Sequence, residues 1–170
     1  MKTLFPNKKT LILLIIVLVI VLDQVSKIIV RHDVALNSRI AVIDNVVTLT
    51  RVENTGAFLS LGEHLSKAAY NGIMIFVPVI VLGYALFYLL KHDYESPAMT
   101  IGISLIVSGG AGNLIDRILY GSVTDFLHFN FGLFQTGIVN IADMSITAGF
   151  IILFIKMLFL KEKQKTDPAE

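Results

Sequence analysis

Four long apolar segments constrain the fold of this 170-residue chain more than any other feature. Each is roughly 17–25 residues long, which is the length that an α-helix needs to cross a bilayer core of about 30 Å. Their hydrophobicity is continuous rather than alternating, and in lipid only helices and closed barrels satisfy their own backbone polar groups. The sequence therefore predicts an all-α integral membrane protein that forms a single domain over residues 1–170. Its four expected spans cover residues 11–30, 68–90, 98–118 and 139–160.

Composition supports a membrane protein and excludes several classes of function. Hydrophobic residues make up 55% of the chain and charged residues 16%, against about 45–50% and about 25% in soluble domains. A net charge of +1 gives no electrostatic case for a nucleic-acid partner. Without cysteine the chain has no disulfide, thiolate metal site or cysteine nucleophile. The four histidines are dispersed without ligand spacing, so we expect no metal and no cofactor.

The distribution of lysine predicts how the chain is oriented in the membrane. Loops and tails on the cytoplasmic side carry an excess of Lys and Arg. Seven lysines fall on the side of the two termini, whereas the basic residues on the other side are diluted by acidic ones. We therefore expect both termini in the cytoplasm and two extracytoplasmic loops, at residues 31–67 and 119–138. The seven lysines are Lys2, Lys8, Lys9, Lys91, Lys161, Lys163 and Lys165.

Both extracytoplasmic loops carry strand-like patterns. Residues 47–51 alternate at period two after the turn-forming pair Asp44-Asn45, which indicates a short strand or hairpin. The second loop alternates again over residues 127–133 and, with Phe126 and Phe134, holds four phenylalanines in nine residues. We expect such a loop to lie on the membrane surface.

Polar and charged residues that lipid should exclude converge on one membrane face. A carboxylate at mid-bilayer costs about 2.5–3.5 kcal/mol on insertion scales, so it is usually functional. In the topology above, these residues lie at the outer ends of the first and third spans, at the start of the fourth and in the outer loops. Scattered charges would have fallen on both faces. The residues are Asp23, Lys27, Asn54, Asn113, Asp116, Arg117, Asp125, Asn140 and Asp143.

Structural explanations compete with functional ones at most of these positions. Asp23 and Lys27 are spaced for an i,i+4 ion pair, and Lys27 could also extend to the membrane interface. Asp116 and Arg117 could simply pair with neighbours and fix the third span. The glycines within residues 109–112 are more typical of close packing between helices than of a nucleotide-binding loop.

Asp125 and Asp143 are harder to explain structurally. Neither has a lysine or arginine three or four positions away, and both lie in apolar sequence at the outer face. Two carboxylates close together in a poorly solvated site share one proton. One can then act as a base toward water while the other protonates a substrate carbonyl. This is the chemistry of an aspartic peptidase, and the chain has no G-x-S-x-G or H-E-x-x-H motif to compete with it.

Five short motifs follow one another along nearly the whole chain. Their sequences are Asp-Gln-Val-Ser-Lys at 23–27, Asn-Thr-Gly-Ala-Phe at 54–58, Gly-Gly-Ala-Gly-Asn-Leu-Ile-Asp-Arg at 109–117, Val-Thr-Asp-Phe at 123–126 and Asn-Ile-Ala-Asp at 140–143. In this order, and in a four-span chain of this length, they resemble the motifs of the lipoprotein signal peptidase family, also called signal peptidase II.

This resemblance implies a bacterial inner-membrane aspartic endopeptidase that cleaves diacylglyceryl-modified prolipoproteins just before the lipidated cysteine. It implies four transmembrane helices with a small extracytoplasmic β-structured cradle and a surface-lying segment. Lipidated prolipoproteins and membrane lipid would be its partners, and we expect a monomer that needs no metal. The catalytic residues would be Asp125 and Asp143. The residues that support the site or bind substrate would be Asp23, Lys27, Asn54, Gly56, Asn113, Asp116, Arg117 and Asn140.

Two other classes of function stay open from the residues alone. Proton-coupled carriers also place Asp, Lys and Arg in their spans, but near the midplane between repeated halves, and no repeat is visible here. A non-catalytic membrane assembly factor could use the same charges for packing. An enzyme would process added substrate in detergent without any gradient, whereas a carrier would need a sealed compartment.

Overall fold

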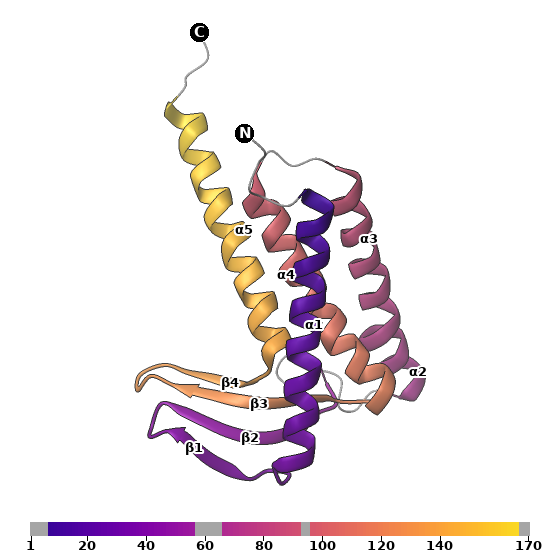
Figure 1. Cartoon of the computed structure of the whole chain (residues 1–170), viewed down its shortest axis with the longest axis vertical. Coiled ribbons are helices and arrows are strands. Elements are labelled where there is room, and N and C mark those ends of the chain that lie inside the picture. The colour runs from indigo at the N-terminus through magenta and orange to yellow at the C-terminus, as the bar shows by residue number, and fades with distance from the viewer. Residues whose placement is uncertain (1–6, 57–65, 93–95, 167–170) are drawn as a thin grey trace.

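The computed structural model of the protein describes residues 7–56, 66–92 and 96–166, with side chains described as far as residue 158. Within these residues, four helical stretches are long and apolar enough to cross a membrane. Figure 1 shows them as a bundle, with both described chain ends at one end and a small sheet at the other. The expected four-span membrane protein with a small β-structured addition is therefore confirmed. The stretches are Lys8–Asp33, Lys67–Lys91, Pro97–Tyr120 and Ile141–Leu158.

The first span, α1 (Lys8–Asp33), extends a few residues beyond the apolar run from which it was predicted. Asn7 caps its start, because the Asn7 side-chain oxygen accepts a hydrogen bond from the backbone N–H of Thr10 at 2.9 Å. At Val34 the chain becomes extended and α1 ends. The polar residues at both ends therefore lengthen the helix beyond its hydrophobic part.

The second span contains a widened turn beside a proline. It consists of α2 (Lys67–Tyr70), the π-helical segment η2 (Asn71–Phe76) and α3 (Val77–Lys91). Proline lacks a backbone N–H, and inside an α-helix its ring meets the carbonyl four residues back. Pro78 lies at the start of α3, directly after the wider π-helical turn. The wider turn thus lies where Pro78 would otherwise disturb the helix, which continues through the span.

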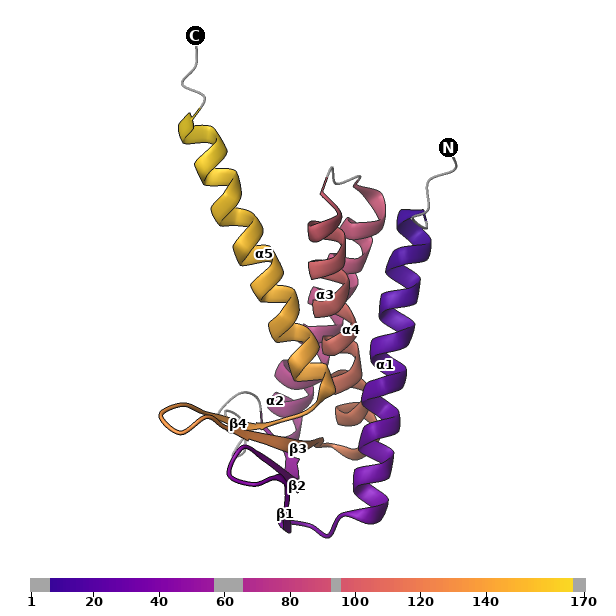
Figure 2. The same cartoon turned by 60° about the vertical axis from the view of Figure 1, so that its left-hand side comes forward.

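The third span, α4 (Pro97–Tyr120), packs against each of the other three spans, and Figure 2 shows it between α1 and α5 (Ile141–Thr166). Three of its glycines allow these close approaches. A Cβ added at Gly109, Gly110 or Gly112 would lie 2.4, 2.6 and 2.6 Å from an atom of α5, α3 and α1, respectively. The interpretation of this glycine segment as a helix-packing element is therefore confirmed.

In the described part of the chain, four antiparallel strands form one sheet in the order β1-β2-β3-β4. The strands predicted from the alternating residues of the two outer loops are confirmed. The pairing of β2 with β3 joins these loops, which lie far apart in the sequence. The strands are β1 (Arg39–Ile43), β2 (Val47–Asn54), β3 (Val123–Asn130) and β4 (Gln135–Val139).

Two tight junctions connect the sheet with the spans. Gly121, with a φ of 73°, caps the end of α4, and β3 begins two residues later. Val139 still pairs with Leu127 in the sheet, and α5 begins at Ile141. The helix of the fourth span therefore starts two residues after the expected start at 139. Both junctions bring the polar ends of α4 and α5 against the sheet.

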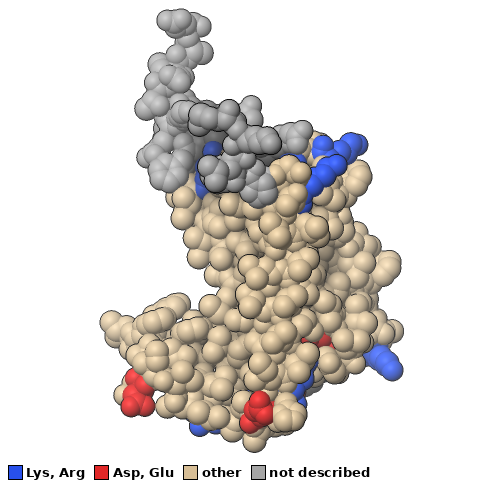
Figure 3. Space-filling model, in the orientation of Figure 1, with Lys and Arg blue, Asp and Glu red and all other residues tan. Residues whose placement is uncertain are grey.

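Apolar and polar side chains are distributed as in a membrane protein. Large apolar side chains are exposed along all four spans, whereas many buried residues are polar or charged. On the face shown in Figure 3, charged side chains lie near the two ends of the molecule, with an uncharged region between them. Lipid would cover the apolar outer faces, so the protein interior is free to hold polar groups that pair with one another.

Candidate active site

The first turn of α5 fixes Asp143 through a reciprocal cap. Asn140 directly precedes α5, and its Oδ1 accepts a hydrogen bond from the Asp143 N–H at 2.8 Å. In return, Asp143 Oδ2 accepts from the backbone N–H of Asn140 at 3.2 Å. This is a capping-box arrangement, in which two residues three apart satisfy each other's N–H groups at a helix start. The Asp143 carboxylate is therefore held at the positive end of the helix dipole.

Asp125 lies on β3, and two side-chain amides hold its carboxylate. Asn140 Nδ2 donates to Asp125 Oδ1 at 2.6 Å, and Asn54 Nδ2 donates to Oδ2 at 3.0 Å. Asn54 ends β2, and its own Oδ1 accepts from the Gly56 N–H at 3.0 Å. Through Asn140, the structure joins Asp125 and Asp143, which lie on different elements.

Asn113 on α4 completes the connection between the two aspartates. Its Nδ2 donates to Asp143 Oδ1 at 2.7 Å, and its Oδ1 accepts from Asn140 Nδ2 at 3.2 Å. Each oxygen of both carboxylates thus receives a hydrogen bond from Asn54, Asn113 or Asn140. The three asparagines orient the carboxylates without adding any charge beside them.

The environment of Asp125 favours its protonated form. The pKa of this carboxyl is raised from 3.8 to about 6, mainly by burial in the protein and to a lesser extent by the charge of Asp143. The hydrogen bonds from Asn54 and Asn140 act in the opposite direction, because they favour the charged form. Asp125 therefore takes up a proton more readily than an ordinary aspartate does.

A buried ionic cluster beneath the aspartates ties together the helices that carry the site. Lys27 is fully buried, and its Nζ donates to Asp23 Oδ2 at 2.8 Å and to Asn113 Oδ1 at 3.0 Å. Asp116 Oδ2 lies 3.1 Å from the same nitrogen. Asp23 also accepts the backbone N–H of Ala142 at 2.9 Å, in the first turn of α5. All three ammonium protons thus have an acceptor, so Lys27 does not extend to the membrane interface.

Asp116 and Arg117 have different partners, although they are adjacent in the sequence. Asp116 forms ion pairs with Lys27 and with Arg31, whose NH2 lies 2.9 Å from Asp116 Oδ2. Arg117 instead donates to the backbone carbonyl of Gly56 at 3.1 Å. Consecutive helix positions point about 100° apart, so Asp116 faces α1 while Arg117 faces the end of β2. Both residues therefore pair with neighbours, as interpreted from the sequence, but the partner of Arg117 is a backbone carbonyl and not a charged side chain.

All ten residues singled out from the sequence belong to one connected set of contacts. The last two residues of the 54–58 motif lie outside the described residues. Sequence reasoning missed Arg31, Glu53 and Thr124, which contact one another beside Asp125. Arg31 could have been found, because it follows Asp23 and Lys27 at intervals of four along the same face of α1.

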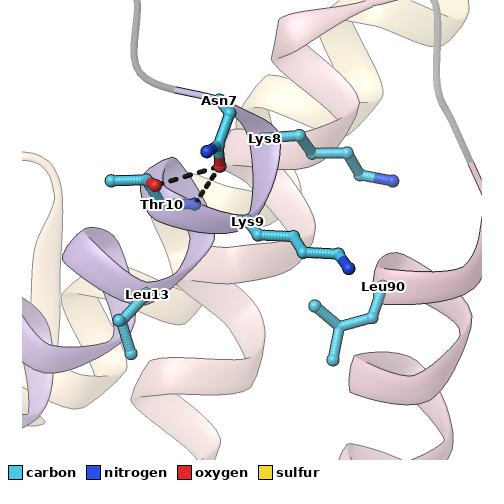
Figure 4. Close-up of a pocket in the computed structure, with 6 residues that line it drawn as sticks. All are labelled: Asn7, Lys8, Lys9, Thr10, Leu13 and Leu90. Carbon is cyan, nitrogen blue, oxygen red and sulfur yellow. Dashed lines mark hydrogen bonds between the residues drawn. The ribbon is translucent and has the colours of Figure 1, made fainter.

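Two hollows on the described surface are lined by neither Asp125 nor Asp143. One lies on the sheet around Thr50 and His128. The other lies at the opposite end of the bundle, between the start of α1 and Leu90 of α3 (Figure 4). Within the described residues, no group of three acidic or histidine side chains could hold a metal ion.

The comparison with known families decides between the classes of function. A family model described as signal peptidase II matches residues 15–159. The chain belongs to the signal peptidase II family. Its resemblance to that family in five motifs is thereby confirmed, and a protease replaces the carrier and the assembly factor as the class of function.

Two curated relatives of this signal peptidase II family member are called lipoprotein signal peptidase. The protein from Streptococcus agalactiae is 37% identical over 150 residues, which cover 88% of this chain and 93% of the relative. The protein from Streptococcus pneumoniae is 37% identical over 152 residues, or 89% and 95% of the two chains. The similarity therefore covers almost the whole length of both proteins.

Two solved structures of bacterial membrane enzymes have the same fold. One superposes with a TM-score of 0.81 at 30% identity and covers 95% of each chain. The other has a TM-score of 0.77 at 32% identity and covers 88% of this chain and 93% of the other. With its four membrane-length helices, this member of the signal peptidase II family is thus a bacterial membrane protease.

Proposed function

We propose that this protein removes signal peptides from lipid-modified prolipoproteins as an aspartic endopeptidase, with Asp125 and Asp143 as its catalytic pair. The cut would fall just before the lipidated cysteine of the substrate. The observation that carries this proposal is the network in which Asn140 binds both aspartates. The two relatives named above, both called lipoprotein signal peptidase, support the choice of substrate.

The geometry suggests how the two carboxyl groups would divide the reaction. Asp125, with its pKa raised to about 6, is suited to hold the shared proton near neutral pH. Asp143 would take a proton from the attacking water while Asp125 donates its proton to the carbonyl oxygen of the scissile peptide bond. The tetrahedral intermediate would then collapse as Asp143 passes its proton to the leaving nitrogen and a hydroxyl of the intermediate returns a proton to Asp125. Because Asn54, Asn113 and Asn140 fix both carboxylates, little reorganisation is needed at the moment of reaction.

The position of the site in the fold suits a substrate that is itself anchored in the membrane. Asp125 and Asp143 lie where α4 ends and α5 begins, against the sheet. A signal-peptide helix and acyl chains could lie along the apolar outer faces of the spans. We place this end of the bundle at the extracytoplasmic face of the bacterial inner membrane and both termini in the cytoplasm. Lys8, Lys9 and Lys91 support this orientation, because they lie at the other end.

The test is cleavage of a purified precursor in detergent, with no gradient present. The full-length protein would be incubated with one prolipoprotein in its diacylglyceryl-modified and its unmodified form, and the products would be identified by mass spectrometry. We expect cleavage of the modified form alone, with the lipidated cysteine as the new N-terminal residue. Equal cleavage of both forms, or a cut elsewhere, would contradict the proposed substrate.

A further inference from the structure

Thr124, directly before Asp125 on β3, is held from three sides. It is fully buried, and its hydroxyl oxygen accepts a hydrogen bond from Arg31 Nε at 2.7 Å. The same hydroxyl donates to the Glu53 carboxylate at 3.1 Å, and the Thr124 N–H donates to Asp116 Oδ2 at 3.3 Å. Arg31 belongs to α1, Glu53 to β2 and Asp116 to α4. One threonine is therefore attached to three separate elements.

These contacts form a closed ring. Glu53 lies directly opposite Thr124 in the pairing of β2 with β3. Glu53 Oε1 also accepts from Arg51 Nε at 3.1 Å, and Arg51 NH1 donates to the backbone carbonyl of Arg31 at 2.8 Å. Arg31, Thr124, Glu53 and Arg51 thus connect the outer end of α1 with both central strands. A second hydroxyl, that of Ser122, donates to Glu53 Oε2 at 2.9 Å and strengthens the ring.

The ring lies next to Asp125 but does not contact its carboxylate. Side chains of neighbouring strand residues point to opposite faces of a sheet. Thr124 accordingly contacts Arg31 and Glu53, whereas Asp125 contacts Asn54 and Asn140. One partner of Asp125 is Asn140, which directly precedes α5 and also caps Asp143. A shift of β3 relative to α1 and α4 would therefore change the position of Asp125 relative to Asn140 and Asp143.

We propose that Arg31, Glu53 and Thr124 are positioning residues that set the place of the Asp125 carboxyl group relative to α5. This inference rests on the catalytic role proposed above for Asp125. Catalytic groups must be held within roughly 0.5 Å of their productive geometry, and rigid supporting hydrogen bonds provide this precision. The ring supplies it through Thr124, whose side chain points to the face of the sheet opposite that of Asp125.

Removal of the Thr124 hydroxyl tests the proposal with little change in shape. Thr124→Val should lower kcat by about 10–100-fold, because a misplacement of about 1 Å can cost a factor of 100. KM for the lipidated precursor should stay within about two-fold, since substrate binding is untouched. Thr124→Ser retains the hydroxyl and should restore kcat to within about three-fold of the unchanged protein. Thr136→Val removes a hydroxyl elsewhere in the sheet, where it binds only Phe129, and should leave kcat unchanged.

A second variant covers the case in which Thr124→Val does not accumulate. Glu53→Gln retains the side-chain shape but weakens the hold on Thr124 and Arg51, so kcat should fall while KM is maintained. The double variant with Thr124→Val should lose little more than the worse single variant, because both break the same ring.

Two results would overturn the positioning role. One is full kcat in Thr124→Val or Glu53→Gln. The other is a loss of kcat in Thr124→Val that is not seen to be reversed in Thr124→Ser, or that is accompanied by a raised KM. Asp125→Asn, measured in the same assay, separates this inference from the proposed function. If Asp125→Asn is inactive and Thr124→Val is fully active, only the positioning role fails. If Asp125→Asn is active, the catalytic assignment itself fails.

Discussion

At the scale of single residues, Asn140 is hydrogen-bonded to both aspartates. It binds the Asp125 carboxylate with its amide nitrogen and the Asp143 backbone with its amide oxygen. Burial makes the charged form of Asp125 less favourable. Its carboxylate accepts hydrogen bonds from Asn54 and Asn140, but no cation among the described residues contacts it directly. The raised pKa of this carboxyl therefore has a measurable consequence for stability.

Stability should depend on pH through Asp125. Its pKa is 3.8 ordinarily and about 6 in the folded protein, so the folded state binds this proton more tightly than the unfolded chain. The resulting stabilisation is fully present below pH 3.8 and is lost as pH rises through about 6. Between pH 5 and 8 this loss is on the order of 1 kcal/mol. The Tm of Asp125→Asn in detergent should fall less over that range than the Tm of the unchanged protein, and identical pH dependence would contradict the assignment.

Loss of Lys27 should destabilise the whole bundle. Its ammonium lies between two fully buried carboxylates, those of Asp23 and Asp116. When one partner of a buried ion pair is removed, the uncompensated charge costs about 3–5 kcal/mol. Lys27→Ala should therefore lower the unfolding temperature markedly, while Lys9→Ala, on the exposed first turn of the same helix, should change it little. Thermal unfolding of both variants in one detergent makes the comparison, and similar melting would exclude the structural role of Lys27.

At the scale of the elements, the position of α5 against α4 sets where Asp143 lies. The closest point of this packing is Gly109, where an added Cβ would meet the carbonyl oxygen of Ala142 at 2.4 Å. Ala142 is the neighbour of Asp143. The two helices can therefore approach only because glycine occupies this position.

A single methyl group at Gly109 should displace the site. Gly109→Ala would push the start of α5 away from α4, so we expect lower stability and a loss of cleavage activity of about 10-fold or more. Gly83→Ala is the matched control, because a Cβ there meets nothing within 4 Å and alanine favours the helix. Activity and Tm of both variants would be measured together. Equal behaviour of the two variants would show that close packing at Gly109 does not position the site.

Some elements could be predicted from the sequence and others could not, for physical reasons. The spans follow from local apolar runs, and the strands from period-two alternation. The π-helical turn before Pro78 depends on how the helix adjusts around the proline, which no periodicity encodes. Glu53 and Thr124 meet only through the register of β2 with β3. Arg117 was expected to pair with a neighbour, but only the direction of its side chain from the helix makes the Gly56 carbonyl that partner.

At the scale of the whole molecule, the orientation in the membrane decides which compartment the site faces. Both described chain ends lie at the end of the bundle opposite the sheet (Figure 1). Lysine-rich ends of spans favour the cytoplasmic side. We therefore expect the sheet and both aspartates to lie outside the cytoplasm.

Reporter fusions test this orientation. A reporter that is active only outside the cytoplasm should be silent when fused after Lys165 and active when inserted within residues 35–50, which include the turn between β1 and β2. The reverse pattern would move the site to the cytoplasmic face, where an exported precursor could not reach it.

We propose that Asp125 and Asp143 act as one catalytic unit. Turnover of a lipidated precursor by their asparagine variants tests this proposal. Both substitutions are nearly isosteric, so the fold should survive. Asp125→Asn and Asp143→Asn should each lower kcat by about 100–10,000-fold or more, the usual scale for acid–base groups. The double variant should be little worse than either single one, because members of a catalytic unit are not additive. Near-normal cleavage by either single variant, at matched protein concentration and Tm, would show that Asp125 and Asp143 are not the catalytic pair.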